Sequence, residues 1–326
     1  MATAEALAGA IDEAPRRTQM SIWWRFRRHR LALFGFVMLG VLVLIAIFAP
    51  LLDRNSFDCL GGLVRDHDNG VLGLLFPEVQ SRSCAAYGTD IGNTDQGPSL
   101  SNLLGTDKAG RDVWSRIVFG ARISLAVGVV AALISSVLGA IIGIVSGYAG
   151  RWIDSLLMRF TELIMTLPTL FLLLIVSSLF GRSVVHLMVI IGLLGWTGKA
   201  RLVRGQVLSL KEMDYVTAAR ALGASAKRIS FVHIFPGTVP YIVVAATLQV
   251  GGAIIAEASL SFLGYGVGFE VPTWGNIMNS AQSLHILQYE PWLWLPPGIA
   301  IVMTVLSVNF VGDGLRDALD PRTKVD

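Results

Sequence analysis

Glu257 is the residue whose position most directly points to chemistry, because it is an acidic residue inside a long apolar stretch, Val239–Leu263. An ionisable side chain at membrane depth is a candidate for a substrate or ion pathway. The alternative is a structural carboxylate that accepts hydrogen bonds from a neighbouring helix. Small and polar neighbours favour tight polar packing: Gly251, Gly252, Ser259 and Ser261.

The only two cysteines, Cys59 and Cys84, both lie in the polar segment 53–116. On the oxidising side of a membrane, an even count predicts one disulfide. That bond would stabilise the segment by about 3 kcal/mol in the chain-entropy description. Two free thiols are the alternative. A metal site is disfavoured, because His67 is the only nearby histidine and no further ligand has suitable spacing.

A third candidate is the polar, basic segment Tyr215–Pro236, YVTAARALGASAKRISFVHIFP, which lies between apolar stretches. Its alanines favour a helix, and their small side chains let a helix enter a groove closely. Gly223 is expected to end or bend this helix. A second helical stretch, Ala226–Phe235, then leads into the next apolar stretch. The layout predicts a surface segment that docks into a partner protein; a plain surface helix without a partner is the alternative.

Motifs of a self-contained enzyme are absent from the sequence. There is no G-x-x-x-x-G-K-[ST] phosphate loop, since Lys199 is followed by Ala200, and Leu193 stands where the first glycine belongs. H-E-x-x-H, C-x-x-C and nucleophile-elbow patterns are absent too. We therefore expect no catalytic, cofactor-binding or metal-binding residues in this chain.

The elements that must position these residues are long apolar stretches. The 326 residues are 53% hydrophobic and 15% charged, whereas a soluble domain has about 25% charged residues. About 20 apolar residues cross a hydrocarbon core of ~30 Å. The sequence predicts an all-α integral membrane protein with six transmembrane helices: Leu31–Leu52, Ile117–Gly147, Leu156–Phe180, Val184–Leu208, Val239–Leu263 and Trp292–Val311.

The distribution of basic residues predicts the orientation of these spans. Of the 26 Lys and Arg residues, 18 lie on the side of the N-terminus, the 209–238 loop and the C-terminus, and positive charge favours the cytoplasmic side. The predicted parts are a cytoplasmic N-terminal segment 1–30, a first transmembrane helix 31–52, an extracytoplasmic loop or cap 53–116, a five-helix core 117–313 with its cytoplasmic loop, and a cytoplasmic tail 314–326.

Features within the spans carry further expectations. Ser135, Gly139, Gly143 and Gly147 are spaced four apart, so they share one helix face and allow another helix to approach closely. That helix belongs either to the same chain or to another subunit. Pro168, Pro296 and Pro297 are expected to permit helix bending. Three basic side chains are expected to extend toward the membrane surface: Lys199, Arg201 and Arg204.

Three stretches together resemble a known family: LGTDKAGRDVWSR at 104–116, the segment 215–236, and AEASLSFLGY at 256–265. The chain is similar over about residues 20–326 to the second permease subunit of bacterial dipeptide, oligopeptide and nickel ABC importers. The resemblance implies a type I ABC importer permease fold in the bacterial cytoplasmic membrane. It also implies a homologous second permease, two cytoplasmic ATPase subunits that bind ATP and Mg²⁺, and an extracytoplasmic substrate-binding protein. Short peptides are the implied cargo, with nickel, haem or another small solute as alternatives.

The family's coupling loop reads E-A-A, three residues, Gly, nine residues, then I-x-L-P. This sequence matches at Ala218, Ala219, Gly223 and Pro236, but Thr217 replaces the glutamate, Phe235 the leucine and His233 the isoleucine. A salt bridge from that position is therefore not expected. The resemblance implies an ATPase-coupling role for Asp214, Tyr215, Thr217, Ala218, Ala219, Gly223 and Pro236. An ion-coupled secondary transporter is the rival interpretation; it predicts paired charges at mid-membrane depth, whereas the sequence offers only the off-centre Glu257.

Overall fold

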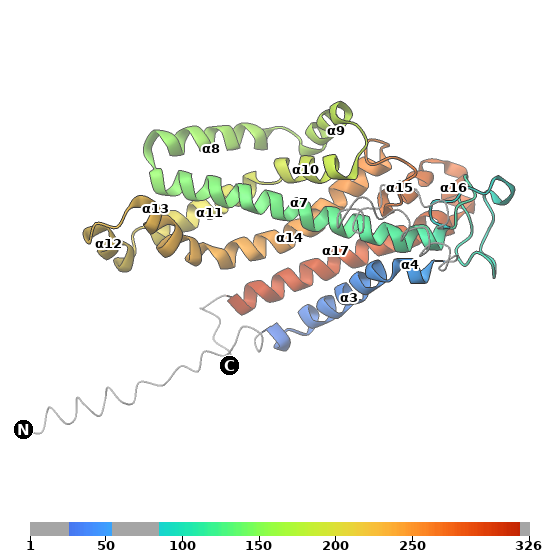
Figure 1. Cartoon of the computed structure of the whole chain (residues 1–326), viewed down its shortest axis with the longest axis horizontal. Helices are drawn as coiled ribbons and strands as arrows, with labels where there is room; N and C mark the ends of the chain where they lie inside the picture. Colours follow the sequence, from blue (N-terminus) through green and yellow to red (C-terminus); the bar gives the residue numbers. More distant parts are fainter. Residues whose placement is uncertain (1–25, 54–84, 320–326) are drawn as a thin grey trace, which may run out of the picture.

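The computed structural model describes residues 26–53 and 85–319, and the regular elements in these ranges are helices, accompanied by one isolated bridge between Thr106 and Asp112. This confirms the predicted all-α fold. The longest helices run along the long axis of the molecule (Figure 1): α7 (Val113–Ala149), α14 (Phe235–Phe262) and α17 (Pro291–Leu319). Cys59 and Cys84 lie outside the described residues.

Four stretches of helix are long and apolar enough to cross a membrane unaided: α3 (Arg30–Ile47), α7, α14 with the helical residues before it (Ala226–Phe262), and α17. Two further candidates are bent pairs of helices. α8 (Arg151–Thr166) and α9 (Thr169–Phe180) meet at 89°, and α10 (Val184–Leu194) and α11 (Thr197–Leu210) meet at 41°. The predicted number of six spans is reached if each bent pair is one span.

The third predicted span, 156–180, is therefore not one straight helix. Leu167 is extended, with ψ of 134°, and Pro168 is the extended N-cap residue before α9. Proline lacks a backbone N–H and disfavours the helical conformation of the residue before it, which explains the break here. The fourth predicted span bends at Gly195 and Trp196. By contrast, α17 continues as a helix through Pro296 and Pro297.

The small-residue face of α7 is filled by α11 of the same chain. A Cβ atom added to Gly143 would lie 2.7 Å from the backbone oxygen of Ala200, and one added to Gly147 would lie 2.8 Å from Cβ of Val207. Such distances leave no room for a side chain, so these glycines permit the close approach of the two helices. The partner of this face was expected to be a helix of the same chain or of another subunit, and in the structure it is a helix of the same chain.

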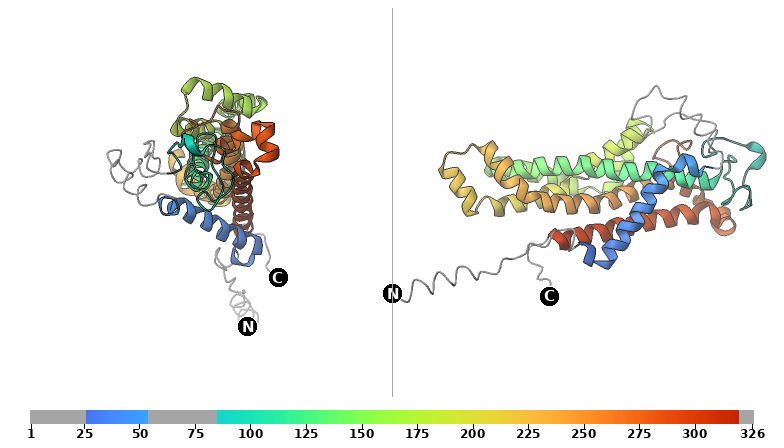
Figure 2. Two further views of the ribbon diagram at one scale, coloured as in Figure 1. Left: turned by 90° about the vertical axis from the view of Figure 1, so that its right-hand side faces the viewer. Right: turned by 60° about the horizontal axis from the view of Figure 1, so that its bottom comes forward.

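The short elements gather at the two ends of the bundle (Figures 1 and 2). One end, called the α12 end here, has α12 (Asp214–Ala221), α13 (Ala226–Arg228) and the π-helical stretch η3 (Ile229–Ile234). The other, called the α15 end, has the loop 85–112 and five short elements: α4 (Ala49–Leu52), η2 (Ile91–Asn93), α15 (Trp274–Met278), η4 (Asn279–Gln282) and α16 (Leu284–Tyr289).

Candidate functional site

The docking segment, defined here as residues 214–236, forms two helical arms joined at Gly223. Gly223 has φ of 80°, its N–H donates to the carbonyl of Arg220 at 3.1 Å, and the N–H of Ala224 donates to the carbonyl of Ala219 at 3.1 Å. This pair of bonds is the Schellman motif, in which glycine accepts a left-handed conformation at the end of a helix. The expectation that Gly223 ends the first helix is confirmed.

The second arm begins at a side-chain cap and continues into a membrane helix. Ser225 Oγ accepts a hydrogen bond from the N–H of Arg228 at 3.3 Å, which satisfies one of the free donors at a helix start. Helical structure then runs without interruption from Ala226 to Phe262. Pro236 is the second residue of α14, which directly follows the π-helical stretch η3. The second arm and α14 therefore form one continuous helix.

Apolar side chains anchor both arms to the bundle. Val216 of α12 is fully buried, as are Ile229 and Ile234 of η3. They pack in one cluster with Val203 and Val207 of α11. The inner face of the docking segment is thus fixed to the helices that it connects.

The opposite face of the docking segment is apolar and exposed. Leu222 is 88% exposed, and Phe231 is 60% exposed. Tyr215 and Val232 are exposed as well. Three basic residues of the segment are also exposed, namely Arg220, Lys227 and Arg228. A group of exposed apolar side chains rimmed by polar ones is typical of a protein interaction surface.

The predicted coupling residues have distinct places in the segment. Asp214 lies in the first turn of α12, where a negative charge is favoured by the helix dipole. Ala218 is exposed, and Ala219 is half-buried. The hydroxyl of Tyr215 donates to the carbonyl of His233 at 3.4 Å, so it links the two arms. The structure thus brings all of the predicted residues into one surface element.

Thr217, which replaces the glutamate of the family pattern, uses its hydroxyl within its own helix. Its Oγ1 atom lies 2.9 Å from the carbonyl oxygen of Asp214 and 3.1 Å from that of Met213. The side chain also lines a surface hollow with Tyr148, Lys211, Glu212 and Arg220. The threonine hydroxyl is therefore engaged locally, while the site around it stays open.

An ion pair near the α12 end was not anticipated from the sequence. Arg204 of α11 donates from Nε and Nη2 to the two carboxylate oxygens of Asp154 in α8, at 2.6 and 2.7 Å. Ser146 of α7 also donates to Asp154. Such two-pronged contacts are strong and directional. This ion-pair network joins three helices next to the docking segment; the only signal in the sequence was opposite charge at two nearby span ends.

Lys199 differs from its expected position. It is buried rather than extended toward a membrane surface, and its ammonium donates to Ser135 Oγ at 2.6 Å. The expectation that Lys199 extends to the surface is wrong, because the small side chains of α7 admit it into the interface between α7 and α11. Arg201 remains exposed and lines a hollow between α8 and α11.

Glu257 lies far from the docking segment, within the packed part of α14. It is fully buried and accepts hydrogen bonds from Ser261 at 2.7 Å and from Ser124 of α7 at 3.2 Å. Thr273 also donates to it. Ser124 in turn accepts from the N–H of Trp274 at 3.3 Å. The carboxylate joins α14 to α7 and to the start of α15, which is the arrangement of a structural carboxylate; a role in a pathway stays a prediction.

Comparison with known proteins adds two family matches. Residues 139–325 match the model described as "Binding-protein-dependent transport system inner membrane component". Residues 19–58 match the model described as "N-terminal TM domain of oligopeptide transport permease C". The first match contains the whole docking segment and Glu257.

Several relatives are similar over nearly their full length. The chain is 36% identical over 300 residues to the dipeptide transport system permease protein DppC of Alkalihalophilus pseudofirmus, covering 92% of this chain and 88% of the relative. It is 35% identical over 326 residues to the oligopeptide transport system permease protein OppC of Bacillus subtilis, covering 98% and 96%. It is 34% identical over 313 residues to the glutathione transport system permease protein GsiD of Pectobacterium atrosepticum, covering 96% and 94%.

Proposed function

Because the chain belongs to the family of binding-protein-dependent transport system inner membrane components, we propose that it is the permease subunit of an ATP-driven importer of short peptides. Relatives named for dipeptide, oligopeptide and glutathione transport support this cargo. The apolar helices fit a protein that crosses the cytoplasmic membrane several times. Nickel, haem and other small solutes are less well supported, since these relatives are peptide permeases or glutathione permeases.

The main structural support for this proposal is the arrangement of buried and exposed residues in the docking segment. Its inner face is anchored by Val216, Ile229 and Ile234, while Leu222 beside the Gly223 turn and Phe231 of η3 remain exposed. Exposed apolar groups on an anchored support suit a groove in another protein, where they gain binding free energy when water is removed. The sequence has no phosphate loop, so the partner in this groove is a separate ATPase subunit that supplies ATP and Mg²⁺.

The α12 end is proposed to face the cytoplasm, together with both termini of the chain. The excess of Lys and Arg at this end supports this orientation. Arg220, Lys227 and Arg228 lie on the docking segment itself. The α15 end then faces outward, where the extracytoplasmic substrate-binding protein delivers cargo. A homologous second permease and a second ATPase complete the complex.

The route of coupling depends on the way the docking segment is attached. Its second arm continues into α14 without a break, and its anchors touch α11 and α7. Closure of the ATPases on ATP moves the docking segment as a unit, and α14 and α11 move with it. The solute pathway is proposed to lie between this chain and the second permease, with access alternating between the two sides of the membrane.

Leu222→Asp tests the docking of the ATPase. An aspartate at this exposed position costs the fold little, but it places a charge in the proposed apolar contact, so co-purification of the ATPase subunits should fall by about tenfold or more. The matched control is Leu100→Asp, which changes an equally exposed leucine at the α15 end. If both variants retain the ATPase equally well, the docking segment is not the contact.

A further inference from the structure

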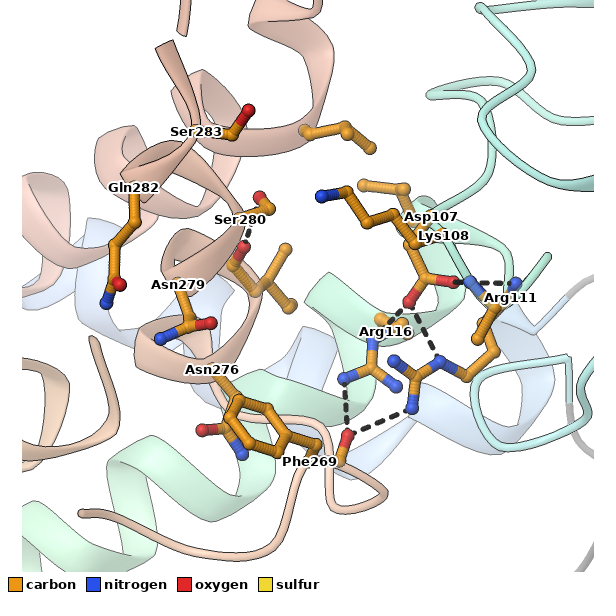
Figure 3. A pocket seen from close by; sticks show the side chains of 14 residues that line it. Asp107, Lys108, Arg111, Arg116, Phe269, Asn276, Asn279, Ser280, Gln282 and Ser283 are labelled. Atoms are coloured by element: carbon orange, nitrogen blue, oxygen red, sulfur yellow. Dashed lines mark hydrogen bonds and ion pairs between the residues drawn. The ribbon is translucent and has the colours of Figure 1, made fainter. Parts of the chain in front are cut away.

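A polar hollow of about 420 Å³ opens at the α15 end, opposite the docking segment. It lies between the loop before α7 and the elements α15 and η4 (Figure 3). We call it the outer pocket. Its polar side chains belong to Asp107, Lys108, Arg111, Arg116, Asn276, Asn279, Ser280, Gln282 and Ser283. No residue of the proposed coupling site takes part in it.

One wall of the outer pocket carries more positive than negative charge. Asp107 accepts from the backbone N–H groups of Ala109 at 2.9 Å and Arg111 at 3.0 Å, and from Nε of Arg111 at 2.8 Å. Arg116 lies 3.6 Å from the same carboxylate. Asp107 is therefore fully occupied, and it balances only one of the two arginines. Both arginines also donate to the carbonyl of Phe269, which fixes their positions.

Lys108 adds a positive charge that the structure does not balance. Its side chain is exposed, and it has no ion pair or hydrogen bond in the part of the chain that the structure describes. Its ammonium group extends across the hollow toward Ser280 and Ser283 (Figure 3). The turn that presents it is rigid, because Asp107 N–H donates to Arg111 O at 3.0 Å and Gly110 N–H donates to Asp107 O at 2.8 Å. A fixed support thus holds an unpaired cation over a pocket.

The facing wall offers groups that suit a peptide backbone. Asn279 donates from Nδ2 to the carbonyl of Phe262 at 2.5 Å, and Gln282 donates to the same oxygen. Because the amide nitrogen of Asn279 is held there, its side-chain oxygen turns toward the middle of the pocket (Figure 3). The apolar side chains of Ile277 and Leu293 complete the lining. This wall provides hydrogen-bond acceptors for N–H groups and an apolar surface for a side chain.

We propose that the outer pocket binds the C-terminal end of a short peptide on its way into the transporter, with the peptide carboxylate at Lys108. A carboxylate is the anion that matches a single unpaired ammonium group, and charge-assisted hydrogen bonds are the strong ones. The N–H groups of the last residues face Asn279. The proposal rests on the proposed peptide-import function, and it assigns a recognition site that lies apart from the coupling machinery.

Lys108→Ala in the reconstituted complete transporter tests this assignment. Uptake is measured for one peptide with a free C-terminus and for its C-terminal amide, with the same binding protein throughout. For the free peptide, we expect the apparent KM to rise about tenfold, whereas the amide changes less than twofold. Lys108→Arg keeps the charge and should restore most of the difference. Leu100→Asp makes the same change of net charge at an exposed side chain outside the pocket, and it should affect neither peptide.

A second measurement locates the peptide directly. A peptide with a photoreactive C-terminal residue should label residues of the outer pocket, and Lys108→Ala should reduce this labelling. The proposal is overturned if both peptides lose uptake equally in Lys108→Ala, or if labelling of the pocket does not depend on Lys108. A wild-type transporter that takes up no peptide contradicts the proposed function instead, so the two failures are distinguishable.

Discussion

Two helix ends in this molecule have the same local structure and different surroundings. The turn after α12 contains Gly223 and the turn after α14 contains Gly264, with φ of 80° and 83°. At Gly264 the bonds are again those of a Schellman motif, from Gly264 N–H to Ser261 O at 3.1 Å and from Tyr265 N–H to Leu260 O at 2.8 Å. A Cβ atom added to either glycine would meet nothing within 4 Å. The local turn is therefore the same, and the difference lies in the surroundings of the residues next to each glycine.

At the α12 end, the turn presents an exposed side chain. Leu222, next to Gly223, is 88% exposed, and the chain beyond it is fixed mainly by apolar anchors. At the α15 end, the neighbours of the glycine are less exposed, with 44% for Leu263 and 47% for Tyr265, and the chain beyond them leads into the packed interior. Ser177 donates to the carbonyl of Tyr265 at 2.5 Å, and Val267 is buried. We propose that the α12 end contacts another protein, whereas the α15 end is stabilised by contacts within the chain.

The buried polar network of Glu257 should be the most sensitive point of the α15 end. In Glu257→Ala, the hydroxyls of Ser124, Ser261 and Thr273 lose their shared acceptor, and a cavity remains. We expect the free energy of unfolding to fall by about 2–4 kcal/mol. Thermal unfolding of the purified chain in detergent measures this change.

Glu257→Gln is the matched control, because it keeps the size of the side chain and one acceptor oxygen. Its free energy of unfolding should fall by less than half of the loss in Glu257→Ala. An unchanged unfolding temperature in Glu257→Ala would contradict the structural role. If that variant were stable but transported nothing, the pathway alternative for Glu257 would be favoured.

The ion pair between Arg204 and Asp154, near the α12 end, should contribute less to the free energy of unfolding than the Glu257 network does. The side chains of Arg204 and Asp154 are 33% and 16% exposed, so water screens their attraction. A double-mutant cycle with Arg204→Ala and Asp154→Ala should give a coupling energy of about 1 kcal/mol in unfolding experiments. A coupling as large as the loss in Glu257→Ala would show that the α12 end is as tightly stabilised as the α15 end, and the contrast between the two ends would then be wrong.

Features that depend on neighbouring residues were predictable from the sequence. The turn at Gly223 is expected from a glycine after a run of helix-forming alanines, and apolar length located four unbroken candidate spans and two bent pairs of helices. The break before α9 was signalled by Pro168. The angle of 89° between α8 and α9 was not predictable from the sequence, because it depends on how α9 packs against α10.

Features that depend on distant residues were not predictable. Arg204 and Asp154 are 50 positions apart, and several acidic residues could have been the partner of that arginine. The burial of Lys199 depends on Ser135, which is 64 positions away. The outer pocket likewise combines Lys108 with residues more than 150 positions further along the chain. The sequence predicted only that Lys199 and Arg204 extend toward the membrane surface, because the packing of the helices decides which residues they meet.

The central claim is that the docking segment couples ATP hydrolysis to transport. Substitutions at the two glycine turns test it most directly. Valine is strongly disfavoured at a positive φ, so Gly223→Val and Gly264→Val impose the same local strain at opposite ends. The amount of peptide imported per ATP hydrolysed is measured for both variants in the reconstituted transporter. We expect Gly223→Val to lower this ratio by about tenfold or more and Gly264→Val to change it less than twofold. An unchanged ratio in Gly223→Val, or an equal loss in both variants, would contradict the claim.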